Sequence, residues 1–366
     1  MEQNDTNLTD LVEYLITQGY SAANVDGYKI INTYSSKEKE IESLYSGTGL
    51  RNISHYGIIE LKGKDVLDFL HRLGTNTTLE LPKAHVTTTL FTTDKGRLIS
   101  ACRLINFEDY QLLICDRENK SKVMSWIRKY IITDDVMVND ANGKYNLMEL
   151  MGPQSDSFVR IICGNVVNEI EPNTFKIINT DNLLFFLIKL TDERDFSKFW
   201  LLADFENSKR LVNYMNENKG PFNFNLIGEE AYKSFRIEQG IPVAPNELND
   251  NYNPHEAGLI KYVNFEKGSY IGQEIIARFD TYDEAQKNLC GIEFAETPDY
   301  DESYLLFSSD GSEIGKVTSI VNSIKLNSPI GLAYIRKLHS KEGTKLTVKS
   351  TKGSTVEVTV RSLPFC

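Results

Sequence analysis

The chain contains few of the residues that build disulfide frameworks, metal centres or disordered tracts. Its five cysteines are odd in number, scattered and never in a CxxC pair, which argues against structural disulfides and cysteine-based metal or redox sites. Cys102 and Cys115 lie in apolar, strand-like stretches, so we expect buried thiols there. The five histidines lack HxxxH or HxxE spacing, so no metal site is expected. Only ten prolines occur, which argues against long disordered segments.

Long apolar runs are also missing. The longest, from Leu183 to Leu190, is interrupted by Lys189 and is far shorter than the ~20 residues that a membrane helix needs. The opening residues, MEQNDTNLTDLVEYL, are acidic and polar, unlike a secretory signal or an arginine-rich transit peptide. We therefore expect a cytoplasmic protein with no membrane partner.

Positive charge is scarce relative to negative charge. The formal net charge is -11, which disfavours a phosphate backbone, so nucleic acid is not an expected partner. A local basic pocket for a small anion is still allowed, because the field in a cleft depends on nearby groups. P-loop, GxGxxG and GxSxG patterns are absent, so nucleotide hydrolysis and serine-hydrolase chemistry have no support.

The elements that are present predict an α+β chain of two or three domains. A hairpin is expected over 86–105 around Asp94-Lys95-Gly96, followed by a helix over 118–131. A similar strand–strand–helix order recurs over 147–214, which suggests two related α+β halves, roughly 1–140 and 141–285.

The pattern changes after residue 285. Six short strand-like runs separated by turns replace every helical period, so residues 286–366 are expected to form a separate β-barrel or sandwich.

Three segments carry the most information about function. They are RIEQGIP at 236–242, NPHEA at 253–257 and KGSYIGQE at 267–274. Their order resembles the YgfZ-like folate-binding proteins, which share their fold with the glycine-cleavage T-protein. The segment 42–61 and the DKGR turn at 94–97 extend this resemblance. It implies a T-protein/YgfZ-like folate-binding fold, residues 1–285 forming the folate-binding region, and tetrahydrofolate or a derivative as the cofactor.

Glu238 is the first candidate ligand. It lies on the core side of a helix opened by Gly228, and a carboxylate there can accept a paired N–H and amino group from a pterin edge. The alternative from the sequence is an ion pair with Arg236 or Lys233. The resemblance favours the pterin role, because this glutamate matches the one that holds the pterin in T-proteins.

The third segment supplies further candidates. Lys267 precedes two glycines, a composition typical of a turn where backbone approaches a ligand or of an ordinary strand-to-helix turn. Arg278 could meet the folate glutamyl tail or pair with Glu274. The candidate cofactor-binding residues are Arg236, Glu238, Lys267, Gly268, Tyr270, Gln273, Arg278 and Asp116.

Two departures from the family bear on mechanism. YgfZ-like proteins carry cysteine where this chain has Ser269, so thiol chemistry is not available there. T-proteins carry paired aspartates on the hairpin strand, where this chain has Ser100 and Ala101. Loss of the carboxylate near the folate nitrogens disfavours the T-protein reaction, so no catalytic residue is assigned.

Three functions follow from this. The leading hypothesis is a non-catalytic tetrahydrofolate-binding accessory protein that supports iron–sulfur protein maturation, with iron–sulfur client proteins as partners. The alternative is a folate-dependent one-carbon transferase, for aminomethyl or methyl groups, that uses Asp94 or Asp116 in place of the missing aspartates. The third is a scaffold that has lost folate.

Overall fold

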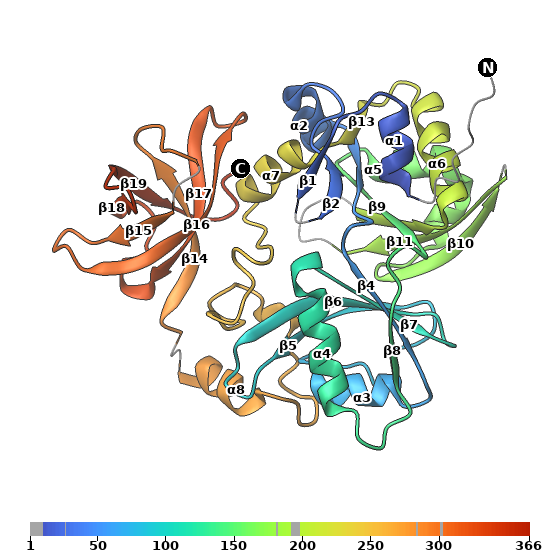
Figure 1. Cartoon of the computed structure of the whole chain (residues 1–366), viewed down its shortest axis with the longest axis horizontal. Coiled ribbons are helices and arrows are strands. Elements are labelled where there is room, and N and C mark those ends of the chain that lie inside the picture. The colour runs from blue at the N-terminus through green and yellow to red at the C-terminus, as the bar shows by residue number, and fades with distance from the viewer. Residues whose placement is uncertain (1–9, 26, 181, 192–197, 283–284, 301–302) are drawn as a thin grey trace.

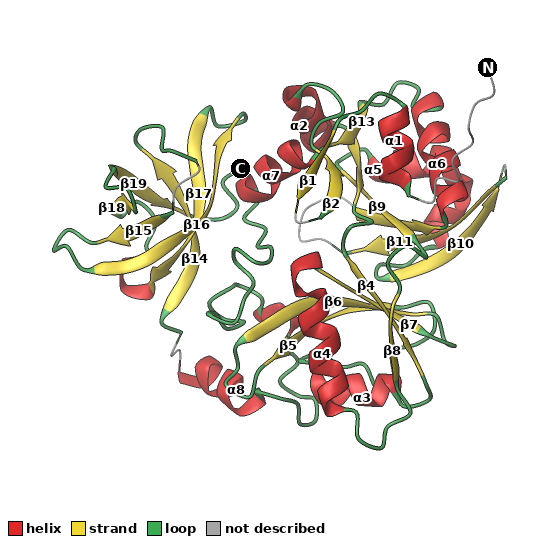
Figure 2. Cartoon of the chain, in the orientation of Figure 1, coloured by secondary structure: helices red, strands yellow, loops and turns green. Residues whose placement is uncertain are grey.

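Two sheet-and-helix bodies and a barrel surround a set of central loops (Figure 1). The computed structural model describes residues 10–25, 27–180, 182–191, 198–282, 285–300 and 303–366. Helices and strands mix in the two N-terminal bodies, whereas the C-terminal body consists of strands and one short helical turn (Figure 2). The predicted α+β fold with a C-terminal β-barrel is therefore confirmed.

The first body is built on a six-stranded sheet in the order β10-β11-β12-β9-β3-β13, in which only β13 and β3 run parallel. Apolar faces of α1, α5 and α6 pack on it in one core. α1 begins at Leu11 because the Asp10 carboxylate accepts the Val12 N–H. The strands and helices are β3 (Thr48–Asn52), β9 (Asn146–Met151), β10 (Thr174–Thr180), β11 (Leu183–Leu190), β12 (Lys198–Ala203), β13 (Phe224–Ile227), α1 (Leu11–Thr17), α5 (Ser155–Cys163) and α6 (Phe205–Glu217).

The second body is a five-stranded antiparallel sheet in the order β5-β6-β7-β4-β8, covered by α3 and α4. The predicted hairpin is its β5–β6 pair, and Gly96 takes a φ of 66° in the turn, a conformation that suits glycine. Cys102 and Cys115 are buried thiols, as predicted. The elements are β4 (Gly57–Lys62), β5 (Val86–Thr92), β6 (Leu98–Asn106), β7 (Gln111–Cys115), β8 (Met137–Asp140), α3 (Val66–Leu73) and α4 (Lys120–Tyr130).

The two sheets do not follow the chain order that the sequence suggests. Strand β3, early in the chain, pairs with β9 and β13 and so belongs to the six-stranded sheet. A boundary near residue 140 therefore does not separate the two sheets in space. The physical reason is that a parallel β3–β13 pair joins segments far apart in the sequence, which local patterns do not encode.

The barrel is closed by six strands in the order β14-β17-β16-β15-β18-β19. The helical residues described within it form only the 3₁₀ turn Lys337–His339. Its strands are β14 (Lys287–Phe294), β15 (Tyr304–Phe307), β16 (Glu313–Ser323), β17 (Ser328–Arg336), β18 (Lys345–Ser350) and β19 (Thr355–Arg361). The six-stranded all-β arrangement is thus as predicted, while the domain boundary at 286 stays a prediction.

A long connector, residues 239–272, joins the three bodies. It runs from α7 (Glu229–Glu238) to α8 (Gln273–Tyr282). Its apolar residues, such as Leu248 and Tyr252, pack in one core with Leu98 of β6 and Tyr334 of β17. The Tyr252 and Tyr334 rings stack at 3.4 Å between centroids. The connector therefore fixes the barrel to the β5–β6 hairpin.

The remaining elements pack around the first body. α2 packs against α7 through Leu44 and Phe235. The β1–β2 hairpin crosses toward the second body, where Arg117 donates to the Val25 carbonyl over 3.2 Å. Their bounds, with those of the short 3₁₀ turns, are α2 (Lys37–Ser46), β1 (Ala22–Val25), β2 (Tyr28–Ile31), Arg117–Asn119, Gly164–Glu169 and Ile260–Tyr262.

Candidate functional site

Asp116 directly follows β7 in the second sheet, at the end of this strand that faces the connector. In the β6–β7 register the last pair is Arg103 opposite Ile114. Continued by two residues, past the end of β7 at Cys115, this register would place Ala101 opposite Asp116. Residues directly opposite in an antiparallel pair lie on the same face, roughly 4.5–5.5 Å apart at Cβ. The chain therefore carries a carboxylate across the strand pair from Ala101, one of the two positions that replace the T-protein aspartates.

The Asp116 carboxylate is fixed and electrostatically tuned. Its Oδ2 accepts the backbone N–H of Ala244 in the connector over 2.9 Å. Burial raises the pKa of Asp116 to about 6, against the lowering effects of that hydrogen bond and of Arg236 and Arg51. A carboxyl that titrates near neutrality is suited to proton transfer and charge stabilisation.

Arg51 on β3 forms the charged network nearest to Asp116 in the first body. Its Nη2 donates to Glu229 Oε2 over 2.9 Å, and its guanidinium stacks on the Tyr232 ring at 3.5 Å. Burial opposes the charge, yet the Glu229 carboxylate raises the pKa of Arg51 above its usual value. Burial, with Arg51 close by, lowers the pKa of His55 to about 3, so this histidine stays neutral. Arg51 therefore stays charged, and the Glu229 and Glu149 carboxylates beside it balance that charge.

Arg236 on α7 binds the connector and the barrel. Its Nη1 lies 3.3 Å from Glu247 Oε2, and its Nη2 donates to Ser319 Oγ over 2.8 Å. Ser319 in turn donates to Glu247 Oε1 over 2.7 Å. Arg236 and Glu247 are both buried. Arg236 thus acts on Asp116 through its charge, and its direct contact with folate stays a prediction.

Glu238 lies at the end of α7 against the barrel and the C-terminal residues. Its side chain is fully buried, and its oxygens accept the Tyr45 hydroxyl over 2.5 Å and the Ser323 hydroxyl over 2.6 Å. The ion pair with Arg236 that the sequence allowed is not formed, because Arg236 pairs with Glu247. A pterin could reach this carboxylate only by displacing these hydroxyls, so the pterin-binding role stays a prediction.

We expect Glu238→Ala to destabilise the protein, because the buried Ser323 hydroxyl and the half-buried Tyr45 hydroxyl would lose their acceptor. The expected loss in the free energy of unfolding is about 1–3 kcal/mol, measured by urea denaturation. Glu42→Ala, on the exposed side of α2, is the control and should change stability little. Equal stability of Glu238→Ala and wild type would contradict the hydrogen-bond assignment.

The KGSYIGQE segment forms the end of the connector and the first residues of α8. Lys267 Nζ donates to the carbonyls of His71, Gly74 and Asn76, and so closes the end of α3. Burial lowers the pKa of Lys267 to about 8. The Gln273 amide lies 3.5 Å from the Lys267 carbonyl. This lysine therefore has a clear structural task.

The other candidates in this segment differ in their surroundings. Gly268 has open space where a Cβ would stand and no left-handed φ, so sterics do not require glycine there. The Tyr270 hydroxyl is buried and has no hydrogen-bond partner among the described residues. Arg278 is exposed on α8. Of these, the Tyr270 hydroxyl is the group that a ligand could satisfy.

The structure thus divides the candidate residues into three groups. Asp116 and Arg236 interact through their charges, Glu238 lies at the barrel interface, and the 267–278 residues gather beside α3 and α8. Sequence reasoning missed Glu247 and Arg51 as their partners. Glu247 lies five residues beyond RIEQGIP, and Arg51 lies within 42–61. Only tertiary contacts reveal their roles.

Metal and membrane features are limited. The described residues contain no group of three or more histidine, cysteine, aspartate or glutamate side chains that could hold a metal ion. Among the same ranges, no helix is both long and apolar enough to cross a bilayer.

Comparisons with known proteins bear on this geometry. Residues 11–267 match the GCVT N-terminal domain, and residues 287–366 match the glycine cleavage T-protein C-terminal barrel domain. An aminomethyltransferase of Desulfitobacterium hafniense is 27% identical over 341 residues, covering 93% of each chain. One of Bacillus pumilus is 25% identical over 347 residues, covering 94% of each.

A solved structure agrees with the fold. The glycine cleavage system aminomethyltransferase T from Bartonella henselae superposes with a TM-score of 0.83 at 19% identity, covering 97% of both chains. The YgfZ-like subgroup is not distinguished by these matches, whereas both domains of the larger family are present in order. The chain belongs to the glycine-cleavage T-protein family.

Proposed function

We propose that this protein is a folate-dependent one-carbon transferase, for aminomethyl or methyl groups, in which Asp116 supplies the carboxylate at the reacting centre. The observation that carries this proposal is the β6–β7 register, which, continued two residues beyond its last pair, places Asp116 opposite Ala101. The carboxylate that T-proteins carry at positions 100 and 101 is then supplied by Asp116, from the neighbouring strand. Asp94, the other candidate, is exposed in the hairpin turn and has no such support.

The relatives favour the transferase over the accessory role in iron–sulfur maturation. The bacterial relatives named above are aminomethyltransferases, and neither carries a name that refers to iron–sulfur proteins. Ser269 also removes the cysteine on which thiol-based chemistry at that site would depend. We therefore adopt the transferase alternative, with tetrahydrofolate as the one-carbon acceptor and no iron–sulfur client.

The residues around Asp116 fit a folate. A carboxylate that still accepts hydrogen bonds suits the N–H groups of a reduced pterin. Tetrahydrofolate, when bound, supplies the nitrogens that accept the one-carbon group.

Each protein group then has a definite task. The Asp116 carboxylate stabilises positive charge that develops on the transferred carbon unit. The Ala244 N–H holds the carboxylate in one orientation, so little reorganisation is needed during the reaction. Arg51 and Arg236 favour the ionised form of Asp116, and burial opposes it. The balance leaves the group ionised above about pH 6.

The pH dependence tests this assignment. Because the ionised carboxylate is the active form and the pKa of Asp116 is about 6, we expect the single-turnover transfer rate to rise with pH through about 6 and to level off above pH 7. Asp116→Asn should lose this transition as well as most of its rate. A wild-type profile that is flat between pH 5 and 7 would contradict the role of Asp116, whereas undetectable tetrahydrofolate binding by calorimetry would overturn the whole proposal.

A further inference from the structure

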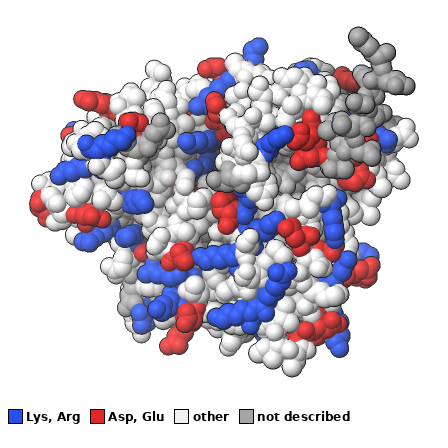
Figure 3. Space-filling model, viewed as in Figure 1, with Lys and Arg blue, Asp and Glu red and all other residues white. Residues whose placement is uncertain are grey.

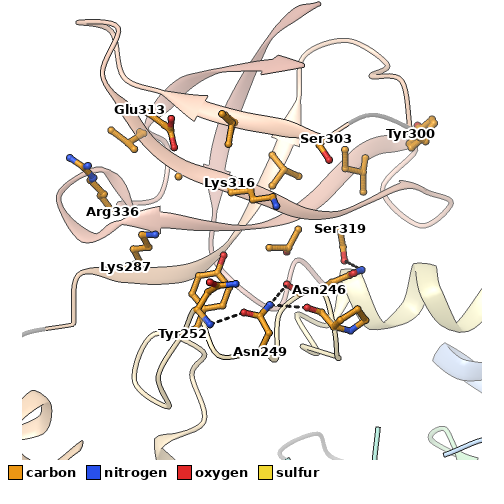
Figure 4. Close-up of a pocket in the computed structure, with 18 of the residues that line it drawn as sticks. Asn246, Asn249, Tyr252, Lys287, Tyr300, Ser303, Glu313, Lys316, Ser319 and Arg336 are labelled. Carbon is orange, nitrogen blue, oxygen red and sulfur yellow. Dashed lines mark hydrogen bonds between the residues drawn. The ribbon is translucent and has the colours of Figure 1, made fainter. Parts of the chain in front are cut away.

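A cavity of about 870 Å³ lies between the outer face of the barrel and the connector (Figure 4). The connector contributes Pro245, Asn246 and Tyr252 to its wall. Ala244, the residue before Pro245, donates its N–H to Asp116, so the same short stretch of the connector contacts both the cavity and Asp116. Its volume falls within the range of roughly 300–1,000 Å³ that is usual for small-molecule sites.

Three positive side chains of the barrel project from its outer face at this cavity. Lys287 on β14 lies directly opposite Arg336 on β17, and Lys316 on β16 lies opposite Tyr334, two residues from Arg336. They therefore share one face of three adjacent strands. Like charges directly opposite each other destabilise a sheet. A bound anion would relieve this repulsion.

The described residues provide little compensation. Lys287, Lys316 and Arg336 form no ion pair or hydrogen bond with the side chains that the structure describes, and Lys287 only approaches the Tyr252 ring, at 5.9 Å. The described lining contains a single carboxylate, Glu313, against these three cations. Charges of both signs are spread over the face seen in Figure 3, and the chain has a net charge of -11. Three neighbouring cations without a described ion-pair partner are therefore unusual in this protein.

The opposite wall is held in place by its own hydrogen bonds. The Asn249 amide donates to the Pro245 carbonyl over 2.8 Å, and the Asn246 amide lies 3.3 Å from Ser319 Oγ (Figure 4). The Tyr334 hydroxyl also donates to the Glu247 carbonyl over 2.9 Å. The connector side of the cavity is thus fixed by hydrogen bonds, which favours a site that exists before the ligand binds.

We propose that this cavity binds a multivalent anion, a short polycarboxylate or a polyphosphate, through Lys287, Lys316 and Arg336. Neutralising the opposed cations removes their mutual repulsion, so binding and barrel stability increase together. The volume accommodates a short chain of anionic groups rather than a single ion. This site is independent of the transfer reaction, since none of its three cations contacts Asp116.

The test uses the full-length protein with two probes, tripolyphosphate and a tri-glutamate peptide, in calorimetry and thermal denaturation. We expect at least one probe to bind, to raise the melting temperature, and to weaken as salt increases. Lys287→Gln/Lys316→Gln should weaken binding about tenfold or more. The control is Lys341→Gln, which removes one positive charge from an exposed position on the barrel outside the cavity. This substitution should leave binding unchanged.

Each outcome decides the proposal. Binding of the peptide alone identifies a carboxylate ligand, binding of tripolyphosphate alone identifies a phosphate ligand, and binding of both supports the shared chemistry. Failure of both probes to bind, or equal binding by wild type and the double variant, overturns the proposal. Loss of one-carbon transfer plays no part in this test, so it can succeed or fail separately from the proposed function.

Discussion

Asp116→Asn should lower the single-turnover rate of one-carbon transfer to tetrahydrofolate by about a hundred- to a thousandfold, the usual effect of removing one fixed group that stabilises transition-state charge. The amide keeps the shape of the side chain and can still accept the Ala244 N–H, so tetrahydrofolate binding should change far less than the rate. The assay follows the folate product, with an aminomethylated lipoyl carrier or an N-methylated amine as donor.

The same substitution should not destabilise the fold. The carboxyl of Asp116 has a pKa of about 6 in the folded protein, against about 4 in an unfolded chain. The folded state therefore holds this proton more tightly, and its stability decreases as pH rises from about 4 to 6. At pH 7.5 Asp116→Asn should be at least as stable as wild type. Asp109→Asn, exposed near the other end of the β6–β7 hairpin, is the matched control and should keep full activity.

Glu247→Ala should cause the largest loss of stability among the substitutions considered. The buried Arg236 guanidinium would keep its charge without its carboxylate partner, and Ser319 would lose an acceptor. Removing one partner of a buried ion pair costs about 3–5 kcal/mol, a large part of the stability of a typical domain. Urea denaturation measures this loss.

The control for Glu247→Ala comes from the same connector. Asp250 forms an exposed pair with Lys122 at 2.9 Å, and exposed pairs contribute about 0–1 kcal/mol. Asp250→Ala should therefore leave the urea midpoint nearly unchanged. If both variants lost the same small amount of stability, the Arg236–Glu247 pair would not be the link between α7, the connector and the barrel.

Elements with strong local signals could be predicted from the sequence. Helix α7 begins at Glu229 after Gly228, and the β5–β6 hairpin turns at Gly96, because capping and turn preferences act over a few residues. The barrel was predictable for a related reason, since short alternating strands leave no helical period over 287–361. The segments RIEQGIP, NPHEA and KGSYIGQE also indicated the larger T-protein family that the domain matches establish, whereas the YgfZ-like subgroup stays a prediction.

The site geometry could not be predicted in the same way. The pairing of Arg236 with Glu247 and the hydroxyls around Glu238 depend on how the connector, α2 and the barrel meet α7. The position of Asp116 opposite Ala101 depends on the register of β6 and β7, which pattern reading leaves open by a residue or two. A slip of one residue would send Asp116 to the other face.

Moving the carboxylate back across the strand pair tests the central claim most directly. The measurement is the single-turnover transfer rate of Ala101→Asp/Asp116→Asn compared with Asp116→Asn alone. If Asp116 supplies the carboxylate that T-proteins carry on the neighbouring strand, the double variant should recover at least about tenfold of the lost rate. An Asp116→Asn protein that transfers the one-carbon group as fast as wild type would contradict the account.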